Sequence, residues 1–428
     1  MLAERVRAKE FALAVVGVGR VGLPVAVKFA SVGVAKVTGI DSNLDLVATL
    51  NQGRVPFEEE GLGSLLTKVR KRGNISFTHQ YDSISGADVI VICVGTPLTQ
   101  DFRPQIGLLI SCFIETLRNL DRKRDVLVII RSTVPPGTTR SMLQPMAKEY
   151  STTNISLAVC PERIVEGHAL EELEHLPEIV GTDDPPARES ARAFFQLLNA
   201  KKLINFTDPT SAELAKLFCN IYRYSTFALA NEFAMIAENL KADGNEAIRV
   251  ANEGYSRAGI PRAGPSGGPC LYKDGYFIND VIAHVGMVRK SWQVNEYVPL
   301  HIVKTIEKIV GPLFKAKVGV LGMTYKRGSD DTRYSPAMRI IEILKDQGAE
   351  VSAHDPHVPN SAPIDSVLKS DVVVVAVNHP EFEKLDLNKM TQASLVYDVC
   401  GTLSGIKARL DGRGIRYTNY GSYSGAQS

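Results

Sequence analysis

Residues 11–41, FALAVVGVGRVGLPVAVKFASVGVAKVTGID, contain an apolar run, a glycine-rich turn, an amphipathic stretch and a second apolar run that ends on an acid. Residues 11–16 have the composition of a buried strand, and the glycine pattern of residues 17–22 follows at once. We expect a helix from this turn to about residue 32, and then a strand over residues 36–40 that ends at Asp41. This order is typical of a βαβ unit that binds a dinucleotide.

The three glycines and the acid each suit one part of such a ligand. Gly17 allows the tight turn, Gly19 lets a pyrophosphate approach the backbone, and Gly22 lets the helix pack on the sheet. Asp41 can accept hydrogen bonds from both ribose hydroxyls and would repel a 2′-phosphate, and the two residues after it are Ser and Asn rather than Arg. Glycine turns also occur without a ligand, but the strand, helix and acid around this one favour NAD binding over NADP binding.

The rest of the chain repeats this pattern. Continuous apolar runs, as expected for parallel strands covered on both faces, occur at residues 88–94, 126–130 and 155–159. Near the C-terminus a strand leads into a glycine turn at residues 317–322, a second strand ends on an acid at residues 351–355, and residues 370–377 resemble residues 87–94. We therefore predict an α/β fold with two Rossmann-like, doubly wound parallel-sheet domains, one at each end of the chain.

A long helix is predicted between the two domains. Residues 210–240 contain neither Pro nor Gly and are rich in Ala, Leu, Glu and Lys, and Asp208 or Thr207 could cap the start of the helix. A helix of that length joins domains or forms a dimer interface. The predicted division is an NAD-binding Rossmann domain over residues 1–205, a central helical linker and dimerisation domain over residues 206–305, and a C-terminal nucleotide-sugar-binding α/β domain over residues 306–428.

Composition excludes several classes of protein. The 428 residues include 49 basic and 47 acidic side chains, so no electrostatic footprint for nucleic acid is present. The apolar runs have the length of strands and are too short to span a membrane, and the N-terminal run leads into the glycine turn rather than a cleavage site. The six cysteines form no CxxC pair, which argues against a disulfide framework or a zinc cluster. We expect no metal and a cytoplasmic protein.

Cys270 differs from the other cysteines in its surroundings. It follows paired glycines in the sequence GGPCLYKD of residues 267–274, a loop too polar and too kinked to be core. A nearby cation lowers the pKa of a thiol, and flexible glycines let a substrate approach it closely. A structural thiol is the alternative. A nucleophilic thiol together with NAD indicates oxidation of an aldehyde through a thioester.

With these motifs the chain resembles the UDP-glucose/GDP-mannose dehydrogenase family, whose members oxidise the C6 alcohol of a nucleotide sugar to a carboxylate in two NAD-dependent steps. The resemblance covers nearly the whole chain. It rests on ordered motifs: GVGRVG with Asp41, VGTP at 94–97, STVPPGTT at 132–139, PER at 161–163, ELAKL at 213–217 leading to Asn220, GGPC with KD at 267–274, and GMTYK at 322–326 leading to DTR at 331–333.

The resemblance implies roles for individual residues. Cys270 would trap the aldehyde and hold the thioester, Lys216 would stabilise the developing oxyanion, and Asp274 would position water or Lys216. Glu162 would be the base for thioester hydrolysis, Thr133 would order a water near the nicotinamide, and Asn220 would face the same cleft as Lys216. Thr96, Thr133, Glu166 and Arg333 would contact NAD. Glu162, Lys216, Asn220, Gly267 and Lys326 would contact the UDP-sugar, and Arg257 would reach the substrate of the neighbouring subunit in a homodimer.

The motifs disagree about the sugar. The acid loop CPER at 160–163 and the segment from Val294 to Pro299 are similar to those of members that act on N-acetylhexosamines, whereas Lys273, Asp274 and Glu166 are similar to those of the glucose type. Glucose-type members place an arginine near Asp398, where this chain has Val-Cys-Gly. A UDP-N-acetylhexosamine (mannosamine or glucosamine) is slightly favoured, with UDP-glucose as the alternative. Two other classes of protein explain fewer of these motifs. A 6-phosphogluconate-type dehydrogenase needs no thiol and no second α/β domain, and a non-enzymatic NAD sensor needs only the glycine turn.

Overall fold

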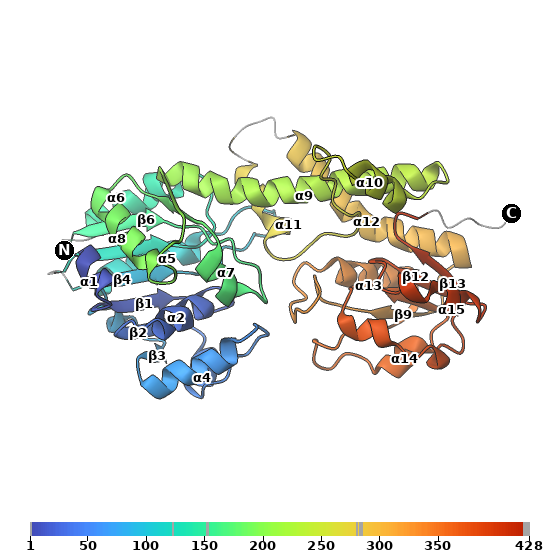
Figure 1. Ribbon diagram of the computed structural model, residues 1–428, viewed down its shortest axis with the longest axis horizontal. Helices are drawn as coiled ribbons and strands as arrows, with labels where there is room; N and C mark the ends of the chain where they lie inside the picture. Colours follow the sequence, from blue (N-terminus) through green and yellow to red (C-terminus); the bar gives the residue numbers. More distant parts are fainter. Residues whose placement is uncertain (1, 122–123, 151–153, 280, 282–285, 423–428) are drawn as a thin grey trace. The chain divides into compact units, whose positions relative to one another are not determined.

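The computed structural model describes residues 2–121, 124–150, 154–279, 281 and 286–422. The chain divides into two compact units. Unit 1 consists of residues 1–219 and 276–281, and unit 2 consists of residues 220–275 and 282–428. Each unit contains one sheet with helices on both of its faces (Figure 1). Two α/β domains with a long helix between them in the sequence confirm the predicted fold class.

The sheet of unit 1 has eight strands in the order β3-β2-β1-β4-β5-β6-β7-β8. All neighbouring strands are parallel except β6 and β7, which pair antiparallel. The strands are β1 Ala12–Val16, β2 Lys36–Ile40, β3 Ile75–Thr78, β4 Val89–Ile92, β5 Val126–Ile130, β6 Ile155–Val159, β7 Glu178–Gly181 and β8 Ile204–Thr207. The strand order reverses between β1 and β4, which is where doubly wound sheets bind dinucleotides at the carboxyl ends of their strands.

Helices cover both faces of this sheet. One core contains apolar residues of α1, α2, α4 and α8, where the Phe29 and Phe194 rings stack 3.9 Å apart; the other contains residues of α5. The helices are α1 Leu2–Arg7, α2 Gly22–Ser31, α3 Leu44–Asn51, α4 Leu62–Arg72, α5 Gly107–Asn119, α6 Gln144–Tyr150, α7 Ala169–His175 and α8 Pro185–Gln196, with the 3-10 turn η1 Tyr81–Ile84 and the π-helical turn η2 Thr139–Leu143.

The predicted long helix is confirmed as α9 Pro209–Asn239, which begins in unit 1 and continues into unit 2. The carboxylate of Asp208 accepts the Ser211 N–H at 3.1 Å, so Asp208 is the capping residue. The helices that follow are α10 Gly244–Asn252, α11 Leu271–Asp274, the turn η3 Gly275–Ile278 and α12 Gly286–Val310.

The sheet of unit 2 has five strands in the order β10-β9-β11-β12-β13, and all of them are parallel. Its strands are β9 Lys317–Leu321, β10 Glu350–His354, β11 Val372–Val375, β12 Leu395–Asp398 and β13 Arg416–Asn419. The helices are α13 Pro336–Asp346, α14 Ile364–Leu368 and α15 Lys407–Asp411, with the 3-10 turns η4 Pro380–Lys384, η5 Leu387–Lys389 and η6 Ser404–Ile406. None of the helices in the described ranges is long and apolar enough to cross a membrane.

Candidate active site

The glycine turn of unit 1 forms a cradle at the start of α2. Gly17 has φ +83°, a conformation that favours glycine, and a Cβ at Gly22 would collide with the Gly17 carbonyl oxygen. Gly19, in contrast, has no atom within 4 Å of the place of a Cβ. Two of the glycines therefore build the turn, and the third leaves room for a ligand against the backbone at the positive end of the helix.

Asp41 lies directly after β2 and is held by the backbone. Its two carboxylate oxygens accept the N–H groups of Val18 and Asn43, each at 3.0 Å, so the acid is tied to the glycine turn. The side chain stays partly exposed. An oriented, accessible carboxylate beside a phosphate cradle can accept hydrogen bonds from ribose hydroxyls.

The loop after β5, which carries Thr133, is fastened at two places. The buried Thr96 hydroxyl donates to the Thr133 carbonyl at 2.7 Å. The buried Glu213 carboxylate of α9 accepts the Gly137 N–H at 2.6 Å, the Thr139 N–H at 2.8 Å and the Thr139 hydroxyl at 2.6 Å. Burial raises the pKa of Glu213, although these hydrogen bonds oppose the rise. Glu213 was visible from the sequence only as part of the ELAKL motif, and its role as an anchor was missed.

Lys216 and Asn220 are one turn apart on α9, and both are buried. The Asn220 amide donates to one carboxylate oxygen of Asp274 at 2.6 Å, and the Lys273 ammonium lies 3.3 Å from the other. Asp274 is 1% exposed, so these partners compensate much of the cost of burying its carboxylate. The structure thus brings together two predicted site residues that are 54 positions apart in the sequence.

The Cys270 loop packs on the loop that follows β9. The Gly268 N–H donates to the Tyr334 carbonyl at 3.0 Å, and the Tyr272 and Tyr334 rings stack with centroids 4.7 Å apart. A Cβ at Gly267 would collide with the Tyr334 carbonyl oxygen, which explains the glycine. Cys270 itself is exposed and is not part of a disulfide. Its exposure suits a nucleophile that must reach a substrate.

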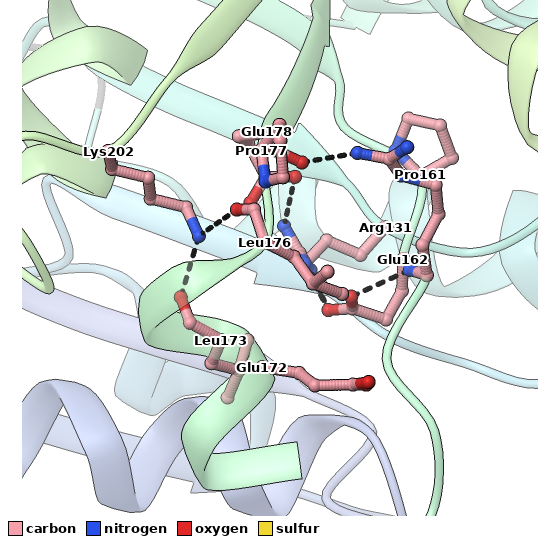
Figure 2. A pocket seen from close by; sticks show the side chains of 10 residues that line it. Arg131, Pro161, Glu162, Glu172, Leu173, Leu176, Pro177, Glu178 and Lys202 are labelled. Atoms are coloured by element: carbon pink, nitrogen blue, oxygen red, sulfur yellow. Dashed lines mark hydrogen bonds and ion pairs between the residues drawn. The ribbon is translucent and has the colours of Figure 1, made fainter. Parts of the chain in front are cut away.

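Glu162 lies in a buried polar network (Figure 2). One of its carboxylate oxygens accepts hydrogen bonds from the Arg131 guanidinium, and the other accepts the N–H groups of Arg163 at 2.7 Å and Ile164 at 3.0 Å. Burial opposes ionisation of Glu162, but the charge and hydrogen bonds of Arg131 outweigh it and lower the pKa of the carboxyl. A carboxylate held in this way is well oriented and only weakly basic.

The remaining predicted site residues lie in three places. The Glu166 carboxylate is 3.7 Å from the Arg20 guanidinium beside the glycine turn. Lys326 and Arg333 both belong to the loop between β9 and α13, where Arg333 pairs with Asp331 at 2.6 Å. Arg257, in unit 2, is exposed and its guanidinium lies 4.9 Å from the Tyr255 ring centroid.

Arg262 was missed by the sequence analysis. Its guanidinium lies against Gly401, where any Cβ would collide with it, and Gly401 has φ +68°. Gly401 follows Asp398 at the carboxyl end of β12, the stretch in which the expected arginine is replaced by Val-Cys-Gly. The cation of Arg262 therefore lies beside the stretch after β12 in which the expected arginine is replaced by Val-Cys-Gly. A glycine at position 401 was the only signal, and it does not identify its neighbour.

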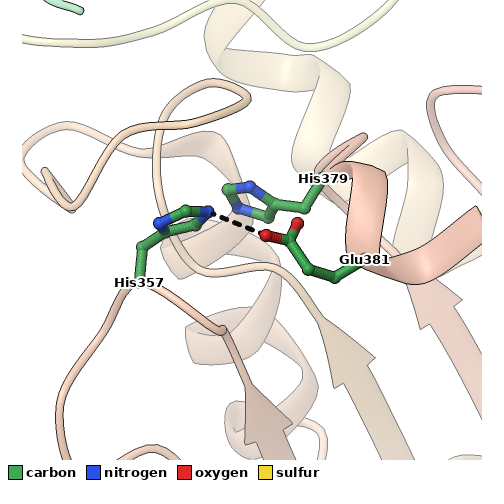
Figure 3. Close-up of side chains that lie close together, drawn as sticks. All are labelled: His357, His379 and Glu381. Atoms are coloured by element: carbon green, nitrogen blue, oxygen red, sulfur yellow. Dashed lines mark ion pairs between the residues drawn. The ribbon is translucent and has the colours of Figure 1, made fainter. Parts of the chain in front are cut away.

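One group of potential metal ligands comes together in the described part of the chain: His357, His379 and Glu381 (Figure 3). Both ring nitrogens of His379 are engaged, since Nε2 lies 3.2 Å from the Asp355 carboxylate and Nδ1 accepts the Gly328 N–H at 3.3 Å. The His379 ring therefore supports the loop after β9 and does not offer a lone pair to a metal ion.

Three models of the UDP-glucose/GDP-mannose dehydrogenase family match the chain: the NAD binding domain over residues 11–199, the central domain over residues 210–297 and the UDP binding domain over residues 319–405. The UDP-N-acetyl-D-mannosamine dehydrogenase of Pyrococcus horikoshii is 34% identical over 387 residues, which are 87% of this chain and 91% of that protein.

Solved structures of similar proteins have the same fold. The structure of the Pyrococcus horikoshii UDP-N-acetylmannosamine dehydrogenase aligns with a TM-score of 0.87 at 31% identity, covering 96% of this chain and 99% of that one. A UDP-glucose dehydrogenase from Pyrobaculum islandicum aligns with a TM-score of 0.82 at 27% identity, covering 90% of this chain and 96% of that one.

Proposed function

Because the chain belongs to the UDP-glucose/GDP-mannose dehydrogenase family, whose NAD binding and UDP binding domains it carries, we propose that it oxidises C6 of a UDP-N-acetylhexosamine, UDP-N-acetyl-D-mannosamine first among them. The observation that carries the choice of sugar is the 34% identity to a relative named for that substrate over 87% of the chain. The acid loop Cys160-Pro161-Glu162-Arg163 favours the same substrate.

The cradle around Gly19 and the oriented Asp41 carboxylate fit NAD. Room against the backbone at Gly19 suits the pyrophosphate, and Asp41 would bind the ribose hydroxyls and repel the additional phosphate of NADP. When bound, NAD accepts a hydride from C6 of the sugar in each of two steps. Thr133, fixed through Thr96 and through the Glu213 anchor, would order a water beside the cofactor.

Cys270 would carry the covalent chemistry. After the first hydride transfer has produced the aldehyde, the Cys270 thiolate would form a bond to the aldehyde carbon, and the former carbonyl oxygen would take a proton, giving a thiohemiacetal. A second NAD would supply the oxidant for the thiohemiacetal, whose loss of a hydride and of the hydroxyl proton would leave a thioester on Cys270. Water would then add to its carbonyl carbon and the carbon–sulfur bond would break, which regenerates the Cys270 thiol and releases the carboxylate. The balance is one alcohol, two NAD and one water converted to one carboxylate, two NADH and three protons.

The charged side chains would act on the oxygens of these species. Lys216 would stabilise the negative oxygen that develops at each hydride transfer. Asp274, held by Asn220, would keep Lys216 or a water in position. Glu162 would orient the hydrolytic water and accept its proton, a task for which its fixed orientation is favourable and its lowered pKa is unfavourable.

A homodimer is part of this proposal. Helix α9 presents apolar side chains to solvent at Tyr222 (72% exposed), Leu229 (48%), Phe233 (38%) and Ile236 (56%), and the exposed Leu240 (72%) directly follows its end. Exposed apolar side chains grouped along one helix suit pairing with a second copy of the chain. Arg257 would then complete the neighbouring site. Mixing inactive Arg257→Ala and Cys270→Ser chains should restore activity in verified mixed dimers, and no recovery would remove Arg257 from the neighbour's site.

The glucose-type features keep UDP-glucose as the second candidate. Lys273, Asp274 and Glu166 resemble that type, and the Pyrobaculum islandicum relative is named a UDP-glucose dehydrogenase. The test is an NADH assay with UDP-N-acetylmannosamine, UDP-N-acetylglucosamine, UDP-N-acetylgalactosamine, UDP-glucose and GDP-mannose in parallel. We expect two NADH per sugar and the highest kcat/KM for UDP-N-acetylmannosamine. A preference for UDP-glucose would overturn the choice of sugar, one NADH would indicate a simple alcohol dehydrogenase, and none would indicate an NAD sensor. A cytoplasmic location is proposed with the same function.

A further inference from the structure

The network behind Glu162 lines a small pocket of about 10 Å³, close to the space that one water molecule needs. Its polar walls come from the ends of several strands and from α7 (Figure 2). The lining side chains with charge are Arg131, Glu162, Arg163, Glu172, Glu178 and Lys202. Burying a charged group costs free energy unless the group is paired. The pairing of these side chains therefore shows which of them depend on one another.

Arg131 is the centre of this arrangement. Its side chain is 2% exposed, and it donates from Nε to the Glu162 carboxylate at 2.9 Å and from Nη1 to the Glu178 carboxylate at 3.1 Å. A second, shorter hydrogen bond also joins Arg131 to Glu162. A carboxylate from the loop after β6 and one from the start of β7 therefore contact the same guanidinium, and when both are ionised their negative charges repel each other.

In the part of the chain that the structure describes, Lys202 and Arg163 do not donate hydrogen bonds to Glu162 or Glu178 from their side chains. The Lys202 ammonium donates to the carbonyl groups of Leu173 at 2.8 Å and Leu176 at 2.6 Å, and the Arg163 guanidinium donates to the Pro177 carbonyl. Both cations influence the network through their charge while their hydrogen bonds go to the backbone. Glu172 accepts the Val165 N–H at 2.5 Å and, among the described residues, makes no hydrogen bond or ion pair with Arg131.

We propose that Arg131 and Glu178 are positioning residues for Glu162. Arg131 fixes the orientation of the Glu162 carboxylate, and the charge of Glu178 sets how strongly Arg131 lowers the basicity of that carboxylate. The proposal rests on the proposed function, since it assigns a purpose to Glu162 in thioester hydrolysis. Neither Arg131 nor Glu178 touches the reacting atoms in this scheme; both act through Glu162.

The charge of Glu178 changes in the neutral range. Burial raises the pKa of Glu178 to about 7, against the attraction of Arg131. Above this pH Glu178 is ionised, and its negative charge offsets part of the effect of Arg131 on Glu162, so Glu162 becomes a stronger base. Below it Glu178 is neutral, the full charge of Arg131 acts on Glu162, and hydrolysis slows. The facing groups that also contribute are Lys202, Arg163 and the buried Cys160 thiol, whose pKa is raised by burial and by the charge of Glu178.

The experiment compares the decay of the thioester between pH 5.5 and 9 in the wild type, Glu178→Gln, Glu178→Asp and Glu172→Gln, with acyl-enzyme measured by mass spectrometry of quenched samples. In the wild type the decay should slow about three- to tenfold as the pH falls through 7, the effect of about one pKa unit on a general base. Glu178→Gln should stay at the slow rate at every pH. Glu178→Asp, which keeps the charge, and Glu172→Gln, which removes a charge from the same pocket without touching Arg131, should keep the transition.

A second measurement does not need the substrate. Because the folded-state pKa of Glu178 lies above its ordinary value, its ionisation destabilises the folded chain, and this loss develops as the pH rises from about 4.5 to about 7. Glu178→Gln lacks the loss, so its Tm relative to the wild type should rise across that range and level off above it. A flat difference in Tm, or a full pH transition in Glu178→Gln, would refute the positioning roles while the proposed function stands. A wild type that oxidises no nucleotide sugar would overturn both.

Discussion

The Glu213 anchor makes a quantitative prediction. In Glu213→Gln the side-chain oxygen can keep both hydrogen bonds from Thr139, because the structure sends these to the same carboxylate oxygen. The amide nitrogen then replaces the oxygen that accepts the Gly137 N–H at 2.6 Å, so a donor faces a donor. One charge-assisted bond is lost and the partly buried Gly137 N–H is left without an acceptor, which together cost about 2–4 kcal/mol.

For a unit of this size such a loss lowers Tm by roughly 5–10 °C, measured by scanning fluorimetry. The loop that carries Thr133 should loosen as well, so kcat should fall more than KM rises. The matched control is Glu115→Gln on α5, where an exposed ion pair with Arg118 is removed and little stability is lost. A Glu213→Gln protein with a Tm within about 1 °C of the wild type would show that the anchor does not stabilise the loop.

Three shorter predictions concern the cofactor, the nucleophile and the nucleotide sugar. Asp41→Ala should narrow the preference for NAD over NADP, and equal kcat/KM for the two cofactors in the wild type would contradict the role of this acid. Cys270→Ser should abolish formation of the carboxylate, so steady-state turnover by this variant at the wild-type rate would refute the covalent mechanism. Arg262→Ala should raise KM for the UDP-sugar about tenfold and leave KM for NAD unchanged, because about tenfold is the loss expected for one charge-assisted hydrogen bond. The same KM for the UDP-sugar in the variant and the wild type would exclude Arg262 from the sugar site.

The parts of the fold that were predictable share a physical cause. Continuous apolar runs such as residues 126–130 must be buried on both faces, and this burial makes them parallel strands whatever lies around them. The long helix was predictable because no residue inside it breaks a helix. Strands β3, β7, β8, β12 and β13 were not predicted. Strands β7 and β8 illustrate why: they are only four residues each and include polar side chains, so their strand conformation depends on the edge of a sheet that is already formed.

The site divides in the same way. The glycine turn and Asp41 were found because the residues involved act through the local backbone. The Arg131–Glu178 pair joins positions 47 apart and the Glu213 anchor joins positions 74 apart, and no local pattern records such partners. The resemblance named Asn220 and Asp274 as site residues, but the hydrogen bond between them is a finding of the structure.

Asp41 and Asp355 show how far a repeated pattern can be trusted. Each acid follows the second strand of its domain, and each accepts backbone N–H groups from the turn after the first strand: Val18 for Asp41, and Met323 and Thr324 for Asp355. Asp355, however, is buried, and His379 lies 3.2 Å from its carboxylate. Burial alone would raise the pKa of Asp355, but the hydrogen bonds from His379 and the backbone lower it to about 2.

The same sequence pattern therefore yields two different groups. The carboxylate of Asp41 is partly exposed to solvent and can bind a ribose, whereas the carboxylate of Asp355 is buried and contacts the turn after β9 and His379. The difference comes from a histidine that follows the third strand of unit 2 and has no counterpart in unit 1, where the matching stretch is Val94-Gly95-Thr96-Pro97. A dinucleotide should accordingly bind unit 1 alone, and binding of two NAD per chain in a calorimetric titration would contradict this assignment.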